Sequence, residues 1–294
     1  MELERYRALL CAIEEGSLSA AAKTLGYTPS AISRMVSSLE EESGFPLLVR
    51  RREGVIPTQN CLRLLPAVRE TLHAADKLAQ LSAQIRGADT GTVTIGLAYH
   101  TWYVWLSRVV SDFHRVYPGI QIRFSSAYSA ELTRQLSARE IDLCIISRRQ
   151  GDHGWIPLRQ DPLMAMVPAA HPLAQAERVP ISAYEREPFI DIYSGVETDN
   201  ANAFARNGIH PNTCYSISDV HAAYSMVEAG LGISMNNALN SRLWTGGVKF
   251  LPLDPPQMVE IGIATDPAMS PAARTFIEFA RPYFRELTEE AVPR

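Results

Sequence analysis

Two helix starts separated by a glycine break constrain the beginning of this 294-residue chain. Ser17 precedes LSAAAKTL, and Thr28 followed by Pro29 begins PSAISRMVSSLEEES, with Gly26 between the two segments. Serine and threonine are preferred helix N-caps, and proline is favoured at the first helical position. An earlier apolar stripe at helical spacing is formed by Leu3, Tyr6, Leu10 and Ile13. The sequence therefore predicts three helices, of which the last two are joined by a tight turn.

The third predicted helix has two chemically different faces. At 100° per residue, one side gathers the apolar residues Ile32, Val36 and Leu39. The opposite side carries Ser30, Arg34 and Ser37, with Ser33 on its flank. This is the helix-turn-helix layout, in which the second helix enters the DNA major groove and arginine can bond guanine bidentately. For this segment alone, an ordinary solvated helix face is the alternative.

The charges near the third predicted helix must be considered position by position, because the region as a whole is neutral. Residues 1–90 hold eleven Lys and Arg against eleven Asp and Glu, so contact with DNA requires a local basic patch. The acidic run 40–42 comes late in the helix, where we expect it to face solvent or partners within the chain. After Gly44, two apolar runs flank Arg50, Arg51 and Arg52, which predicts a β-hairpin wing tipped with arginine beside a phosphate backbone. The alternative is an exposed loop.

A long helix is predicted from about residue 58 to residue 86. Apolar or small residues recur every seven positions in two series, Leu65, Leu72, Ala79 and Val68, Ala75, Ser82. Such a repeat indicates a two-helix seam, although the helix could instead pack only on its own chain. Pro66 is expected to kink it. The sequence GADTG then predicts a linker at residues 86–91.

Residues 91–294 alternate short apolar runs with helical stretches. The strand-like runs are TVTIGL, IQIRF, DLCII, LMAMVP, PFIDI and LGISM, which predicts a mostly parallel α/β sheet. Ligands bind such sheets beyond the carboxyl ends of strands and at helix N-termini. The loops at those positions supply the candidate effector residues Tyr99, His100, Thr101, Trp102, Tyr128, Ser129, Ser147, Arg148, Tyr193, Ser194, Thr198 and Ser218.

The chemistry of these loops indicates an aromatic or anionic ligand. Tyrosine, tryptophan and histidine supply flat walls with polar edges. Ser129, expected to cap the following helix, and Arg148 offer groups for an anion. Packing of the aromatic side chains and solvation of Arg148 are the alternatives.

Several functional classes are disfavoured. No GxSxG, P-loop or HExxH motif appears, so we expect no enzyme, metal or cofactor. The four cysteines are far apart and predict reduced thiols; a redox switch would need two of them close together. The N-terminus lacks a signal-peptide core, and no stretch reaches the roughly 20 apolar residues of a membrane span. We therefore expect a cytoplasmic protein that does not enter membranes.

The chain resembles the LysR-type transcriptional regulators. The resemblance rests on EEGSLSAAAKTLGYTPSAISRMVSSLEEESGFPLLVRR and GVIPT, then on YPGIQIRF, IDLCII, HPLA and VEAGLGIS. It implies a winged helix-turn-helix, a long linker helix and a two-lobed domain like the periplasmic binding proteins. The implied bounds are 1–58, 59–90 and 91–294, with lobe I at about 91–162 and 265–294 and lobe II at about 163–264.

The resemblance also implies a function. Members bind promoter DNA as homodimers or homotetramers, respond to a small molecule, and act on RNA polymerase. The DNA-facing residues carried over are Thr28, Pro29, Ser30, Ser33, Arg34 and Ser37, with Arg50, Arg51 and Arg52 in the wing. Pro29 replaces a common glutamine, Asn60 a common glycine and Tyr128 another glycine, so base contacts and pocket shape should differ here.

Two other functions remain open from the residues. One is a small-molecule-binding or enzymatic α/β protein whose N-terminal helices serve only assembly. The other is a constitutive regulator that has no effector.

Overall fold

The computed structural model describes residues 3–241 and 244–289. The chain divides into two compact units, Met1–Gly87 and Ala88–Arg294, each described here by itself. The predicted domain ends at residues 1–2 and 290–294 lie outside the described residues.

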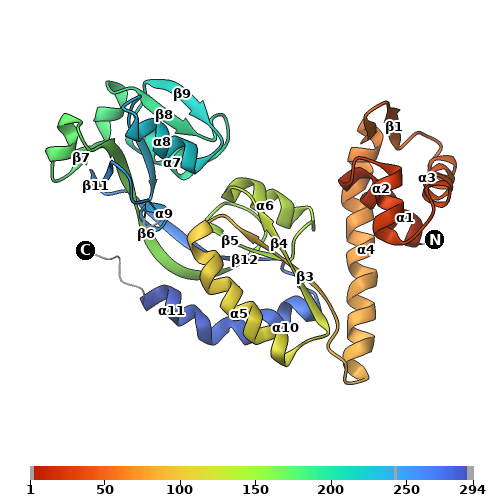
Figure 1. Cartoon of the computed structure of the whole chain (residues 1–294). Coiled ribbons are helices and arrows are strands. Elements are labelled where there is room, and N and C mark those ends of the chain that lie inside the picture. The colour runs from red at the N-terminus through yellow and green to blue at the C-terminus, as the bar shows by residue number, and fades with distance from the viewer. Residues whose placement is uncertain (1–2, 242–243, 290–294) are drawn as a thin grey trace. The chain divides into compact units, whose positions relative to one another are not determined.

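Three helices begin the first unit, as predicted (Figure 1). They are α1 (Leu3–Glu14), α2 (Leu18–Leu25) and α3 (Pro29–Ser43). The Ser17 hydroxyl accepts the Ala20 N–H, and the Thr28 hydroxyl accepts the Ala31 N–H, which confirms both caps. Gly26 closes α2 in the left-handed region at φ 71°, where glycine carries no steric penalty. Ile32, Val36 and Leu39 are buried, as the helical wheel predicts.

The wing follows as β1 (Leu48–Arg51) and β2 (Gly54–Pro57), paired antiparallel. The hairpin prediction is confirmed, but the arginines are placed differently. Arg50 and Arg51 belong to the first strand, and of the three only Arg52 lies in the turn. The apolar run ends at Val49, but the strand pairing continues to Arg51↔Gly54. The hairpin therefore closes with a two-residue turn, and two of the arginines lie in the strand.

Replacing Gly54 with alanine should destabilise the first unit. A Cβ at this position would lie 2.1 Å from the Gly16 carbonyl oxygen, which accepts the Val55 N–H at 2.8 Å. We expect a loss of more than about 1 kcal/mol in thermal or chemical unfolding. Gly44→Ala is the control, because Gly44 also has a positive φ but open space around it. Equal losses in the two variants would contradict this steric account.

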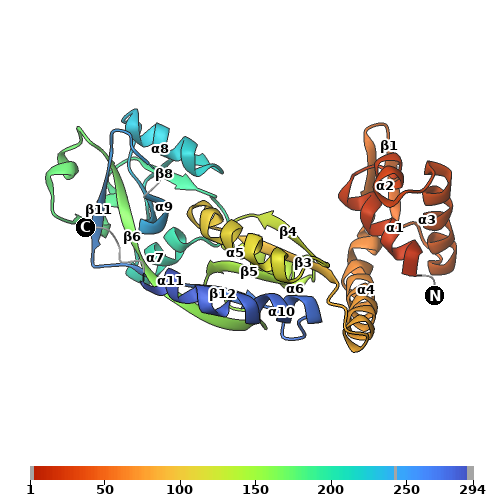
Figure 2. The same ribbon diagram turned by 60° about the horizontal axis from the view of Figure 1, so that its bottom comes forward.

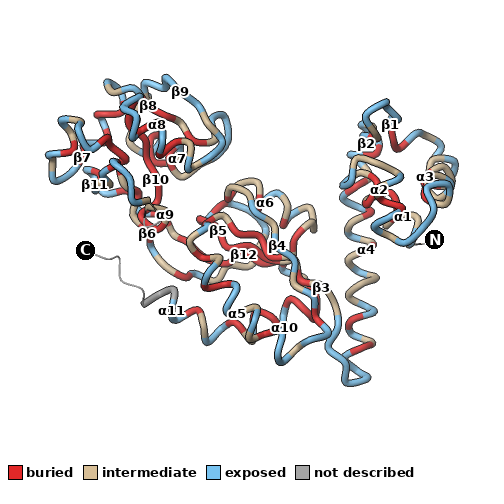
Figure 3. The backbone as a smooth tube through the Cα atoms, viewed as in Figure 1, coloured by how far each residue is buried: buried red, intermediate tan, exposed pale blue. Residues whose placement is uncertain are grey.

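The long helix α4 (Gln59–Ile85) continues past Pro66, and Thr58 caps it. The seven-residue series does not form its exposed apolar face. Leu65, Val68 and Leu72 are buried within the chain, and Leu65 belongs to the core of the first unit. Figure 3 shows exposed stretches along α4. The exposed apolar stripe is instead formed by Leu78, Leu81 and Ile85. The repeat is ambiguous because a single helix packing on its own domain produces it too.

Lobe I of the second unit is a sheet covered on both faces. Its strands are β3 (Gly91–Leu97), β4 (Ile120–Ser126), β5 (Leu143–Ser147) and β12 (Met258–Thr265). Its helices are η1 (His100–Trp102), α5 (Tyr103–Val116), α6 (Ser129–Ser137), α10 (Pro271–Ala280), η4 (Arg281–Tyr283) and α11 (Phe284–Glu289). Leu143 and Ile145 pack in the core with α5 and α10, which lie side by side (Figure 2). Cys144 and Ile146 pack on the α6 side, so alternation along β5 serves both faces.

Lobe II is built around the far half of β6 (Gly154–Pro168). Its other strands are β7 (Val179–Pro180), β8 (Phe189–Ile192), β9 (Thr213–Ile217), β10 (Ser234–Asn237) and β11 (Val248–Asp254). Its helices are η2 (Pro172–Gln175), η3 (Ile181–Glu185), α7 (Asp199–Asn207), α8 (Val220–Glu228) and α9 (Ala238–Ser241). β8 and β9 form a separate parallel pair.

β6 connects the lobes (Figure 1). It pairs with β12 up to Pro162 and with β10 from Leu163 onward. The expectation of a mostly parallel sheet is wrong, because β12 runs antiparallel to β5 and β6, and β10 and β11 run antiparallel to β6. Assigning residues 258–264 to lobe II is also wrong. These residues form the returning strand, which completes the lobe I sheet beside β5.

Candidate effector cavity and DNA-binding face

One surface of the first unit gathers the predicted DNA-facing residues. Thr28, Pro29, Ser30 and Arg34 are exposed at the start of α3, and Ser33 and Ser37 are partly exposed. The Arg50 guanidinium donates to the Ser33 hydroxyl at 3.2 Å. This bond ties the wing strand to the outer face of α3, so the exposed arginine of the helix and those of the wing belong to one surface.

The acidic end of α3 is engaged within the unit. One Glu40 carboxylate oxygen accepts the backbone N–H groups of Leu47 and Leu48 at 2.8 and 3.1 Å. Glu42 pairs with Arg5 at 3.2 Å, and Arg5 also donates to Ser38. These contacts confirm the expectation that the acidic run serves partners in the chain, and Glu40 helps to place the wing.

The second unit contains a cavity of about 190 Å³ between its lobes. This is space for a small organic ligand rather than a single water molecule. Six of the predicted effector residues line it: Tyr99, His100, Tyr128, Ser129, Tyr193 and Thr198. Ser194 and Ser218 line an adjoining pocket together with Tyr128 and Tyr193.

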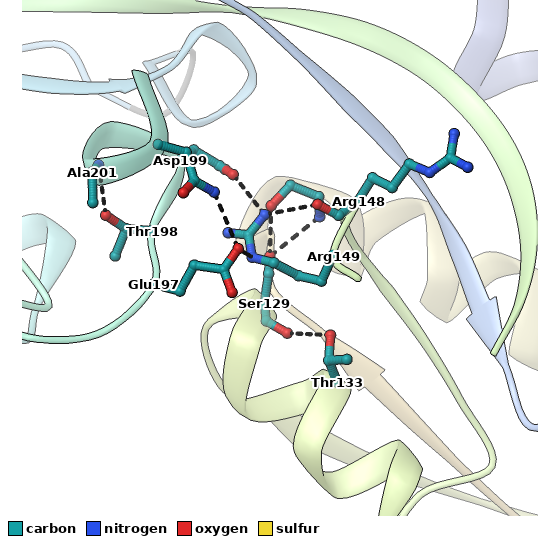
Figure 4. Close-up of polar contacts among 10 residues, drawn as sticks. Ser129, Thr133, Arg148, Arg149, Glu197, Thr198, Asp199 and Ala201 are labelled. Carbon is teal, nitrogen blue, oxygen red and sulfur yellow. Dashed lines mark hydrogen bonds and ion pairs between the residues drawn. The ribbon is translucent and has the colours of Figure 1, made fainter. Parts of the chain in front are cut away.

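The other four predicted residues line neither pocket. Trp102 and Thr101 follow the first strand, but Trp102 is packed in the lobe I core. Ser147 is fully buried and bonds the Ser129 hydroxyl at 3.0 Å. Arg148 has a side chain that is 60% exposed, pairs with Glu260 at 3.1 Å and lies over the Trp155 ring. It extends away from Glu197 and Asp199 (Figure 4), so it does not line the cavity as predicted.

Arg149, and not the predicted Arg148, lines the cavity. Its side chain is only 5% exposed, and its terminal nitrogen donates to Asp199 Oδ1 at 2.9 Å. Its Nε lies 3.5 Å from Glu197 Oε1 (Figure 4). Arg149 follows β5 in lobe I, and Asp199 begins α7 in lobe II. One buried ion pair therefore joins the lobes at the cavity.

A signal for Arg149 was present in the sequence. Side chains alternate along an extended segment, so Arg149 shares the side of Ser147, whereas Arg148 points to the opposite side. The Ser147 hydroxyl bonds that of Ser129, and both Ser129 and Arg149 line the cavity. If the alternation of side chains along β5 is extended past its end at Ser147, it predicts Arg149 as the cavity residue.

Ser129 does not cap α6. It is the first helical residue, and Tyr128 holds the N-cap position without a side-chain bond to the helix. The Ser129 hydroxyl accepts the Ser147 N–H at 3.2 Å and bonds the Ser147 hydroxyl. It therefore fixes the α6 start against β5. The helix N-cap at α7 is Thr198, whose hydroxyl accepts the Ala201 N–H.

Tyrosines from both lobes form the aromatic walls. The rings of Tyr128 and Tyr193 lie 5.1 Å apart at their centroids, inclined by 37°. Tyr193 has φ +63°, an uncommon conformation for a bulky residue. Burial raises the pKa of the Tyr193 phenol, with a further contribution from the Asp219 charge. Burial and then the Asp199 charge raise the pKa of Tyr99, so both phenols stay neutral near pH 7.

Other kinds of site have little support in the described residues. No group of three or more His, Cys, Asp or Glu side chains there could hold a metal ion. The four cysteine thiols are free, and only Cys214 is exposed. No helix in the described ranges meets the length and hydropathy of a membrane span.

The comparisons with known proteins agree with this architecture. The family model "Bacterial regulatory helix-turn-helix protein, lysR family" matches residues 3–62, and "LysR substrate binding domain" matches residues 86–285. The chain is 26% identical to the HTH-type transcriptional regulator YvbU of Bacillus subtilis, over 97% of this chain and 99% of that protein.

Two solved structures share the fold. Full-length OxyR from Pseudomonas aeruginosa has 20% identity and a TM-score of 0.71, with all of both chains covered. Full-length CbnR in complex with its target DNA has 20% identity and a TM-score of 0.62, covering 96% of this chain and 99% of that one. The two family models together span nearly the whole chain. The chain belongs to the LysR family and is a DNA-binding transcriptional regulator with a C-terminal effector-binding domain.

Proposed function

We propose that the cavity between the lobes is the effector site and that its occupancy sets the angle between them. The observation that carries this proposal is the Arg149–Asp199 ion pair, which joins the lobes at the cavity wall. A ligand that fits one lobe angle better than another shifts the population toward it. The linker helix α4 would pass this change to the spacing of paired DNA-binding units.

The proposed bounds are 1–58 for the winged helix-turn-helix, 59–90 for the linker helix and 91–294 for the effector domain. On the DNA side, the first turns of α3 would meet base edges, and the wing would follow the phosphate backbone. The proposed contacts are Thr28, Pro29, Ser30, Ser33, Arg34, Ser37, Arg50, Arg51 and Arg52. The exposure of Arg34 and the Arg50–Ser33 bond support this assignment.

We also propose a homodimer, or a homotetramer built from such dimers, assembled through α4. Leu78, Leu81 and Ile85 are exposed along one side of that helix. Two half-sites multiply DNA specificity, which gives a dimer its advantage. RNA polymerase is the proposed further partner, and the cytoplasm, where bacterial promoters lie, the proposed location. We propose no enzymatic activity.

Leu78→Glu should weaken the dimer. The side chain is 67% exposed in the single chain, and a charge in an apolar seam would have to be desolvated. We expect a dissociation constant raised about tenfold or more in sedimentation or mass photometry. Leu62→Glu is the control, since Leu62 is 45% exposed on the opposite side of the same helix. Equal effects of the two changes would contradict the proposed seam.

DNA binding by the full-length chain tests the function itself. Duplexes selected from a random library should share a sequence, and their affinity should fall steeply with salt. An α/β protein whose N-terminal helices serve only assembly would select no sequence. A constitutive regulator would select one, but no ligand that stabilises the chain would change its affinity.

A further inference from the structure

We propose that the effector is a small amine that is positively charged at neutral pH and has a flat or apolar body. This inference rests on the proposed function, because it takes the cavity between the lobes as the effector site. It reverses the anionic alternative that the loop sequences favour.

The charges around the cavity are predominantly negative. One guanidinium, Arg149, stands against three carboxylates, those of Glu197, Asp199 and Asp219, and two imidazoles, those of His100 and His221, also line the cavity. Arg149 is already bound to Asp199 at 2.9 Å and lies 3.5 Å from Glu197, so its positive charge is offset by carboxylates of the chain itself. A carboxylate entering this cavity would meet uncompensated like charge, whereas an ammonium would be attracted.

Two of the three helix N-termini at the cavity, those of α7 and α8, carry carboxylates of the chain itself. Asp199 is the first residue of α7, and Asp219 caps α8, accepting the Ala222 N–H at 2.7 Å. These carboxylates meet the positive ends of the two helices that an anionic ligand would otherwise use. At the third helix, α6, the Ser129 hydroxyl is held by Ser147.

The walls are suited to a cation. Tyr99, Tyr128, Tyr193 and Tyr224 line the cavity, and phenol faces attract ammonium groups through the ring quadrupole. Burial raises the pKa of Tyr193, and the Asp219 charge adds to this, so the Asp219 carboxylate lies near the Tyr193 phenol. Asn237 is buried in the lining, and its Nδ2 has no hydrogen-bond partner among the described residues. This donor can bond an acceptor atom on the body of a ligand of either charge, so it indicates a polar group on the ligand but not the sign of its charge.

Matched probes separate charge from shape. Phenethylamine, 2-phenylethanol and 3-phenylpropanoate carry the same ring with a positive, neutral or negative end group, and 1,5-diaminopentane adds an aliphatic amine. Thermal unfolding of the full chain with each probe measures binding to the folded state. At least one of the two amines should raise the melting temperature saturably, and the acid should not.

Removing a carboxylate should weaken amine binding specifically. Asp219→Asn is the informative variant because asparagine is as good an N-cap as aspartate, so α8 should keep its start. We expect about three- to tenfold weaker amine binding, with Glu177→Gln, an exposed carboxylate outside the cavity, unchanged. Stabilisation by the acid instead would overturn the amine proposal but leave the effector site standing. If no probe of any charge stabilises the chain, both proposals are contradicted.

Discussion

Arg149→Met should lower the free energy of unfolding of the second unit by about 3 kcal/mol. The guanidinium is almost fully buried and holds Asp199 of the other lobe at 2.9 Å. Methionine fills similar space but leaves the carboxylates of Asp199 and Glu197 without their shared cation. Removing one partner of a buried pair costs far more than the pair itself contributes, because the remaining charge stays desolvated. Chemical denaturation of the full chain, followed by tryptophan fluorescence, measures the change.

Arg148→Met is the matched control. This variant removes the neighbouring arginine, which is exposed and paired with Glu260. It should lower the free energy of unfolding by less than about 1 kcal/mol. Asp199→Asn completes a double-mutant cycle with Arg149→Met, and the coupling energy isolates the bond between the lobes. Similar losses at positions 148 and 149 would contradict the assignment of Arg149 as the residue that joins the lobes.

Arg34→Ala should reduce DNA affinity by about 1–3 kcal/mol and relax sequence preference at one position in each half-site. Arg34 is exposed on the outer face of α3, opposite the buried Ile32 and Val36. From there its fork-shaped guanidinium can bond two acceptors of one guanine, which alanine cannot replace. Affinities for the selected duplex and for its single-base variants, measured at one fixed salt concentration, test this.

Arg51→Ala provides the contrast. A wing arginine that contacts only phosphate should weaken binding to all duplexes alike and reduce the slope of the salt dependence by about one. If Arg34→Ala leaves discrimination among single-base variants unchanged, Arg34 has no role in base recognition.

Local structure was predictable where neighbours in sequence decide it. The caps at Ser17 and Thr28 depend on a side chain reaching a backbone N–H three residues ahead. The buried side of α3 follows from helical spacing alone. Such features are fixed within a few residues, so no knowledge of tertiary contacts is needed.

Features that depend on distant segments were not predictable in the same way. The return strand β12 lies between β5 and β6, and nothing near Met258 indicates which strands it pairs with. The net charge of the cavity depends on Arg149 together with carboxylates that lie about fifty and seventy positions later in the chain. Each loop considered alone therefore suggested an anionic ligand. Which side of α4 is buried likewise depends on how the helix packs against the rest of its own domain, so its seven-residue repeat alone did not reveal it.

The most direct test of the coupling between cavity and DNA is a footprint on a selected duplex. The full-length chain is bound to that duplex with and without a saturating concentration of whichever probe stabilises it, and protection and DNA bend are measured. We predict that ligand changes the protected length or the bend, and that Arg149→Met weakens this response. An unchanged footprint and bend at proven saturation would contradict the coupling of the cavity to DNA binding.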